Sequence, residues 1–153
     1  MKTKTTITEI THEDLVNLLS TATYGSSWVS CTVSGLTHNA VKSDGDCRED
    51  IWANALLAGH PIYLTDEQAE GCTYGGKTLC VNEDESVTYR IELDDVKQGI
   101  ADALDGNFAP GDEDEREWAA KCAIHLADES SEFDNAEADA LMQIIMFGSI
   151  IYA

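Results

Sequence analysis

In the middle of the chain, three short runs typical of β-strands follow one another with no helical pattern between them. They are Pro61–Thr65, Lys77–Val81 and Ser86–Leu93, and they are rich in β-branched and aromatic residues. Gly71–Gly76 supplies turn residues before the second run, and Val81–Ser86 is typical of a hairpin loop before the third. We therefore predict a small, mostly antiparallel sheet.

The segment before these strands carries two amphipathic helical patterns. The first begins after Thr11, whose hydroxyl is a favourable N-cap. The second begins after Asp46, a further expected N-cap, and ends at Gly59. Between the two helices, Trp28–Val33 is a predicted strand and Ser34–Gly45 a predicted loop.

Three more helical patterns follow the strands. The first is expected to begin at Asp94 or Asp95, and in the second we expect Trp118 to face the core. The third begins after Asn135 and is the most apolar, and Ser149–Ala153 after it is typical of a final strand. Residues 1–153 thus predict a single α+β domain, with about five helices packed against one side of the sheet.

The chain is strongly acidic. Nine Lys and Arg residues face 29 Asp and Glu residues, which gives a formal net charge of −20. Such a field repels nucleic acid and anionic membranes and attracts basic partners. Direct binding of DNA or RNA is therefore disfavoured, because it requires a basic surface.

The acidic excess is concentrated in one part of the sequence. Between Glu83 and Asp139 there are 19 acidic and four basic residues, a net charge of −15. Two runs stand out within this region, one in the predicted hairpin loop and one at the start of the helix that carries Trp118. The candidate partner-binding residues are Asp112, Glu113, Asp114, Glu115, Glu117, Glu83, Asp84 and Glu85.

Two interpretations of this acidic excess stay open. Carboxylates in a first helical turn stabilise the helix by ~0.3–1 kcal/mol each, so a solvated surface explains part of it. However, like charges four residues apart destabilise a helix by ~0.2–0.5 kcal/mol per pair, and solubility needs a net charge of only roughly 2–8. The alternative is that the carboxylates imitate nucleic-acid phosphates, which in duplex DNA are spaced about one per 1.7 Å of axis.

Metal-binding patterns are weak. Loops that start at Asp44 and Asp105 lack the ligand and glycine positions of an EF-hand. Cys122 and His125 have a usable metal spacing, but both lie on the apolar stripe of their helix, so we expect them in the core. We predict no metal and no cofactor.

Catalytic motifs are missing from the sequence. It contains no GxSxG elbow, Walker A loop, HExxH or GxGxxG. Tyr74–Lys77 is a glycine turn that ends in lysine, too short for a phosphate-binding loop. The sequence therefore favours a binding protein over an enzyme.

The cellular setting is predicted from what the chain lacks. No apolar run approaches the roughly 20 residues of a membrane helix, and the N-terminus has no apolar signal region. We expect a cytoplasmic protein with reduced cysteines, although Cys72 and Cys80 flank a turn and are close enough in sequence to pair in an oxidising setting.

Three segments resemble small acidic accessory proteins of bacteriophages and conjugative elements. His12–Trp28 resembles their opening, a short helix that ends in a T-A-x-x-G turn before an aromatic residue. Glu137–Ala153 resembles their ending, an acidic-apolar helix followed by F-G-x-I-x-Y, and Gly99–Phe108 resembles an internal helix. Thr32–Cys47 has no counterpart. The resemblance implies a mobile-element protein, in the context of anti-restriction or anti-CRISPR inhibitors acting in a bacterial host cell.

The combined expectation is a non-enzymatic inhibitor that binds the basic nucleic-acid-binding surface of a host nuclease or CRISPR effector. Two alternatives belong to other classes. One is a protein that sequesters a signalling nucleotide through Gly71–Lys77, Arg90 and Lys97. The other is a self-associating accessory protein that forms a homodimer by strand addition at Ser149–Ala153.

Overall fold

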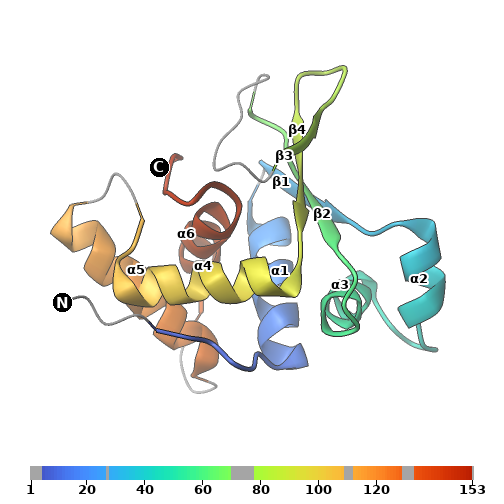
Figure 1. Ribbon diagram of the computed structural model, residues 1–153, viewed down its shortest axis with the longest axis horizontal. Coiled ribbons are helices and arrows are strands. Elements are labelled where there is room, and N and C mark those ends of the chain that lie inside the picture. The colour runs from blue at the N-terminus through green and yellow to red at the C-terminus, as the bar shows by residue number, and fades with distance from the viewer. Residues whose placement is uncertain (1–4, 27, 70–77, 109–111, 129–132, 153) are drawn as a thin grey trace.

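The computed structural model describes residues 5–26, 28–69, 78–108, 112–128 and 133–152. Within these residues it contains six helices and one four-stranded antiparallel sheet, so the predicted α+β class is confirmed (Figure 1). The helices are α1 (His12–Gly25), α2 (Gly35–Val41), α3 (Arg48–Leu57), α4 (Leu93–Asp105), α5 (Glu113–Ala127) and α6 (Asn135–Phe147). The strands are β1 (Val29–Thr32), β2 (Ile62–Asp66), β3 (Thr78–Val81) and β4 (Val87–Ile91).

The sheet has the order β1-β2-β4-β3, with every neighbouring pair antiparallel. Residues alternate between a buried and a more exposed face, as expected where helices cover one side of a sheet. The buried face carries Ile62 and Leu64 of β2 with Val87, Tyr89 and Ile91 of β4.

Helix α6 is the centre of the core. Every residue from Ala140 to Phe147 is buried, and the helix packs against α1, α4 and α5. Helix α4 approaches it closely at Gly99, where an added Cβ would lie 2.9 Å from the Cα of Ile145 and would overlap its side chain. Because such a helix is apolar nearly all round, it requires cover on every side, and the other helices supply it.

Several helix starts differ from the prediction by one to three residues. The cap at Thr11 is confirmed, since its hydroxyl accepts a hydrogen bond from the Asp14 backbone N–H at 3.1 Å. The other N-caps are Cys47 instead of Asp46, Glu92 instead of Asp94 or Asp95, and Asp134 instead of Asn135. Where several polar residues adjoin one another, each is able to cap, and packing of the helix decides among them.

Helix α2 lies within the segment predicted as a loop. Ser34 caps it by accepting a hydrogen bond from the Thr37 N–H at 3.2 Å, and Lys42 follows its end. The helix has only seven residues and one buried side chain, Thr37, so it lacks the apolar stripe that identifies longer helices.

The predicted final strand is wrong for the described residues 149–152, which form an irregular tail. The side-chain carbonyl of Gln143 in α6 accepts hydrogen bonds from the backbone N–H groups of Ile151 and Tyr152, both at 2.7 Å. The Gln143 amide group in turn donates to the Tyr152 carbonyl at 3.2 Å. Gln143 thus satisfies three backbone groups of Ile151 and Tyr152, and the tail does not pair with the sheet.

Candidate functional site

The predicted acidic run of α5 lies at the start of that helix. Asp112 is the N-cap and accepts a hydrogen bond from the Glu115 N–H at 2.8 Å. Glu113, Asp114 and Glu117 are exposed, and no hydrogen bond or ion pair ties their side chains to another described residue. We call Asp112–Glu117 the α5 acidic turn.

The second predicted group, Glu83, Asp84 and Glu85, lies at the tip of the β3–β4 hairpin, and all three residues are exposed. We call it the hairpin acidic tip. Asp84 has a structural role, because it accepts hydrogen bonds from the hydroxyl and the backbone N–H of Ser86 at 2.6 and 3.1 Å. These bonds lower the pKa of the Asp84 carboxyl below its ordinary value.

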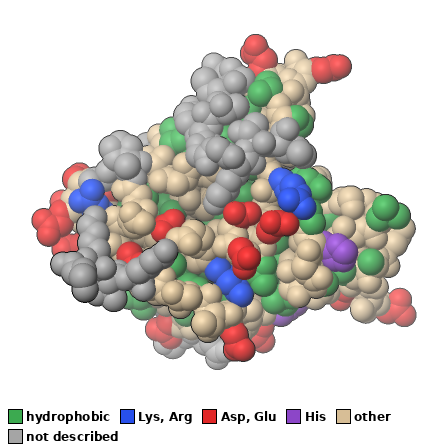
Figure 2. Space-filling view, viewed as in Figure 1, with side chains coloured by type: hydrophobic (Ala, Val, Ile, Leu, Met, Phe, Trp, Pro, Cys, Tyr) green, Lys and Arg blue, Asp and Glu red, His purple; other side chains and the backbone are tan. Residues whose placement is uncertain are grey.

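The structure does not join the two acidic groups into one patch. Strand β3 pairs with β4, whereas α5 packs on α4, α6 and α1. In Figure 1 the hairpin projects at the top of the molecule, and α5 begins at its left-hand end. Acidic side chains appear at both ends and also between them on the face shown in Figure 2. The eight predicted residues therefore form two sites on one acidic face.

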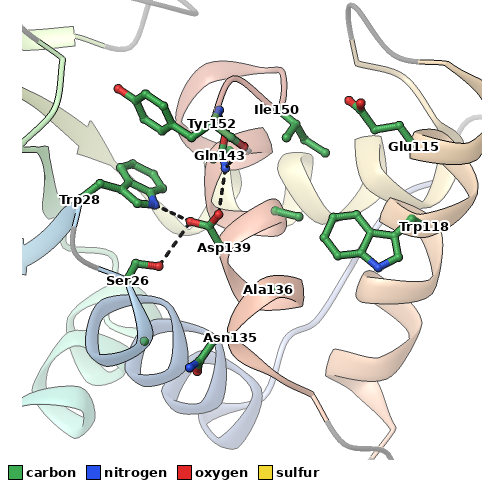
Figure 3. Close-up of a pocket in the computed structure, with 12 residues that line it drawn as sticks. Ser26, Trp28, Glu115, Trp118, Asn135, Ala136, Asp139, Gln143, Ile150 and Tyr152 are labelled. Carbon is green, nitrogen blue, oxygen red and sulfur yellow. Dashed lines mark hydrogen bonds between the residues drawn. The ribbon is translucent and has the colours of Figure 1, made fainter.

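Beside the α5 acidic turn lies a pocket of about 490 Å³ that the sequence did not predict (Figure 3). One wall is formed by Glu115 and Trp118, which point from α5 toward α6 and the C-terminal tail. The opposite wall includes Trp28, which follows α1, and Tyr152 of the tail. The prediction that Trp118 faces the core is wrong, since 40% of its surface is exposed.

Asp139 of α6 lies at the base of this pocket, where a hydrogen-bond network holds it (Figure 3). Its carboxylate accepts from the Trp28 indole N–H, from the Ser26 hydroxyl at 3.3 Å, and from the Gln143 amide at 3.0 Å. Gln143 is itself 1% exposed and holds the tail. The sequence signal available for this site was the pair Asp139 and Gln143, two polar residues four positions apart in the most apolar helix.

Glu115 is the least satisfied group of the pocket. Its Oε1 atom is buried from solvent and has no hydrogen-bond partner among the described residues. A buried carboxylate oxygen without a donor destabilises a fold.

Cys122 and His125 occupy the neighbouring part of α5. Cys122 is fully buried as predicted, and burial together with the charge of Glu137 raises the pKa of its thiol to about 12. His125 is only partly buried, and its Nδ1 lies 2.5 Å from the Oε2 of Glu137. Within the described ranges, no three or more His, Cys, Asp or Glu side chains are grouped so as to hold a metal ion.

The residues of the predicted nucleotide site are engaged elsewhere. Arg90 pairs with Glu92 at 3.3 Å, and the Lys97 ammonium donates to the Thr8 carbonyl at 3.0 Å. Gly71–Lys77 lies outside the described residues, and so does Cys72, the candidate partner of Cys80 in an oxidising setting. In the part of the chain that is described, no helix is long and apolar enough to cross a membrane.

No protein-family model matches the chain, and neither the curated proteins nor the solved structures include a significant match to it. The resemblance of three segments to phage accessory proteins therefore stays an expectation.

Proposed function

We propose that this chain is a non-enzymatic inhibitor that binds the basic nucleic-acid-binding surface of a nuclease or CRISPR effector in a bacterial host cell. The supporting observation is the α5 acidic turn, where Glu113, Asp114 and Glu117 project into solvent without a basic partner among the described residues. Carboxylates held in this way repel one another, and a basic surface relieves that repulsion.

The acidic face favours a basic cleft as the partner surface. The hairpin acidic tip and the α5 acidic turn lie at separate ends of this face (Figure 2), so a partner that contacts both must present positive charge over an extended surface. Nucleic-acid-binding clefts have that property because they neutralise successive phosphates. Binding at these two ends would exclude the nucleic acid from the cleft.

The two rival functions have less support. A nucleotide site would need free cationic groups, whereas Arg90 and Lys97 both have partners within the protein. Homodimer formation through a terminal strand loses its basis, because described residues 149–152 form no strand. A third interpretation is that the acidic surface is only solvated and has no partner. The following experiment distinguishes it from the proposed inhibitor.

The experiment is displacement of labelled duplex DNA or guide RNA from a panel of restriction nucleases and CRISPR effectors. The protein is expected to displace nucleic acid at 50 mM NaCl and to lose about tenfold or more in potency by 300 mM, because exposed charges are screened within roughly a Debye length. The triple variant Glu113→Gln/Asp114→Asn/Glu117→Gln is expected to lose a similar factor at low salt.

A matched control removes the same charge elsewhere. The variant Glu9→Gln/Glu13→Gln/Asp44→Asn also neutralises three exposed carboxylates, none of which belongs to the α5 acidic turn or the hairpin acidic tip. It is expected to retain most of the potency. Equal loss in both triple variants, or no displacement anywhere in the panel, contradicts the proposal and favours a merely solvated surface.

A further inference from the structure

We infer that the pocket between α5, α6 and the C-terminal tail binds the guanidinium group of an arginine side chain from a protein partner. The inference deepens the proposed function and rests on it for the source of the arginine. The recognition chemistry, however, comes from the pocket itself.

The charge of the pocket calls for a cation. Among the described residues, its lining includes two carboxylates, Glu115 and Asp139, and no lysine, arginine or histidine. A phosphate or carboxylate ligand would be repelled by both groups. A neutral apolar ligand would leave the buried Oε1 of Glu115 without a hydrogen bond.

The acceptor oxygens of the pocket favour a ligand that donates several N–H groups. Glu115 Oε1 accepts no hydrogen bond, and Asp139 already accepts three of the roughly four that a carboxylate can take. These two acceptors come from different helices, α5 and α6 (Figure 3). A guanidinium carries five donors and no acceptor in a fixed plane, so it has enough donors for both carboxylates.

The aromatic side chains distinguish guanidinium from ammonium. Trp118 on one wall faces Trp28 and Tyr152 across the pocket (Figure 3). A guanidinium is planar and weakly hydrated, so it stacks on such rings, whereas the lysine ammonium is a compact and strongly hydrated point charge. Arginine is therefore expected to bind better than lysine at equal charge.

The surroundings of the pocket favour a polypeptide as the source. Glu115 belongs to the α5 acidic turn, in which the adjacent Asp114 and Glu113 are exposed. The α5 acidic turn thus presents exposed carboxylates on its outer surface and one carboxylate, that of Glu115, to the pocket. A peptide in which an arginine is flanked by other basic residues can fill the pocket and also pair with the exposed carboxylates beside it. A free monovalent cation cannot do both.

The test uses three acetylated tripeptide amides, namely Lys-Arg-Lys, Lys-Lys-Lys and Lys-citrulline-Lys. The second keeps the charge of the first, and the third keeps the shape of its central side chain without the charge. Binding is followed through the indole N–H signals of ¹⁵N-labelled tryptophan. We expect Lys-Arg-Lys to shift the Trp28 and Trp118 signals, with Trp52 of α3, outside the pocket, unchanged. Its affinity should exceed that of the other two peptides by about threefold or more.

Two isosteric variants separate the pocket from general attraction to the acidic surface. Glu115→Gln is expected to lower the affinity for Lys-Arg-Lys about tenfold, whereas Glu117→Gln, an exposed residue that does not line the pocket, should lower it less than twofold. Glu115→Gln replaces a carboxylate oxygen that accepts no hydrogen bond from a described residue, so its thermal stability should stay close to that of the parent protein. This makes the variant suitable for the comparison.

Two results would overturn the inference. Equal affinity for the arginine and lysine peptides excludes guanidinium recognition, and equal losses in the two variants exclude the pocket. The outcome is independent of the displacement experiment. Arginine-dependent tryptophan shifts without displacement anywhere in the panel would retain the pocket assignment and reject the nuclease-inhibitor proposal.

Discussion

The hydroxyl of Tyr152 donates a hydrogen bond at 2.7 Å to the Oδ2 atom of Asp66, 86 positions earlier in the chain. Asp66 is the last residue of β2 and is fully buried, and its other oxygen accepts from the Gln68 N–H at 2.9 Å. The C-terminal tail therefore supplies a donor to a buried carboxylate at the end of the sheet. It also carries the Tyr152 ring to one wall of the pocket.

Tyr152→Phe is expected to destabilise the protein by about 1–3 kcal/mol, because it removes a donor from a buried carboxylate. Chemical denaturation measures the loss, and Tyr63→Phe is the control, since Tyr63 lies on the more exposed face of β2. A double-mutant cycle with Asp66→Asn should give a coupling energy of ~0.5–3 kcal/mol. Additive effects would show that the hydrogen bond does not contribute to stability.

Gly99→Ala tests the close approach of α4 to α6. Alanine gains up to about 1 kcal/mol in helix propensity, but the added Cβ would lie 2.9 Å from the Ile145 Cα. Overpacking of a core typically costs about 1–3 kcal/mol, so we expect net destabilisation. Gly35→Ala in α2, where nothing lies within 4 Å of an added Cβ, should be neutral or stabilising. A more stable Gly99→Ala variant would mean that the two helices separate easily.

Asp105→Asn tests the attachment of the N-terminal segment to the end of α4. Hydrogen bonds from the hydroxyl and backbone N–H of Thr5 lower the pKa of the Asp105 carboxyl below its usual value. A depressed folded-state pKa contributes stability above the ordinary pKa of about 3.9, and this contribution is lost as the pH falls further. The parent protein should therefore exceed the variant in melting temperature at pH 7, with the difference closing toward pH 2–3.

The control for this pH series is Asp44→Asn, which makes the same charge change at an exposed site. Its difference from the parent protein should vary much less with pH. If the Asp105→Asn difference were constant from pH 7 to pH 2, the hydrogen bonds from Thr5 would not depend on ionisation.

Thiol labelling at pH 8 should separate the four cysteines that the structure describes into two groups. Cys80 and Cys47 are exposed and should react first, with Cys47 the slower because its hydrogen bond to Asp50 raises the pKa of its thiol. Burial raises the pKa of Cys31 well above its ordinary value and that of Cys122 to about 12. Both should stay unlabelled until denaturant is added, as peptide mapping by mass spectrometry would show. Rapid native labelling of Cys122 would instead indicate that α5 detaches readily from α6.

The sequence predicted the elements that carry strong local signals. Helix α1 has a threonine cap and an apolar stripe, and β2 and β4 have alternating patterns, so each was located to within a few residues. Helix α2 has almost no apolar stripe, and the tail at residues 149–152 has β-branched residues but bonds to Gln143 instead of a strand. The prediction for α2 failed because the segment has almost no apolar stripe. The prediction for the tail failed because local composition does not identify the hydrogen-bond partner of a backbone group.

The site was less predictable than the fold. The exposure of the α5 acidic turn followed from its composition, but the pocket combines residues from Trp28 to Tyr152 that only the packed structure brings together. Trp118 was placed in the core because an apolar stripe identifies a helix face without stating what covers it. Here α6 and the tail do not cover Trp118 completely, and its side chain forms one wall of the pocket.

The central position of α6 has a consequence for how the chain is made. This helix is the last along the sequence, yet α1, α4 and α5 all pack against it. During synthesis the earlier helices leave the ribosome before their common partner exists, so their apolar faces stay uncovered until α6 follows. Mutual repulsion between the acidic charges of neighbouring unfinished chains is then expected to oppose their association.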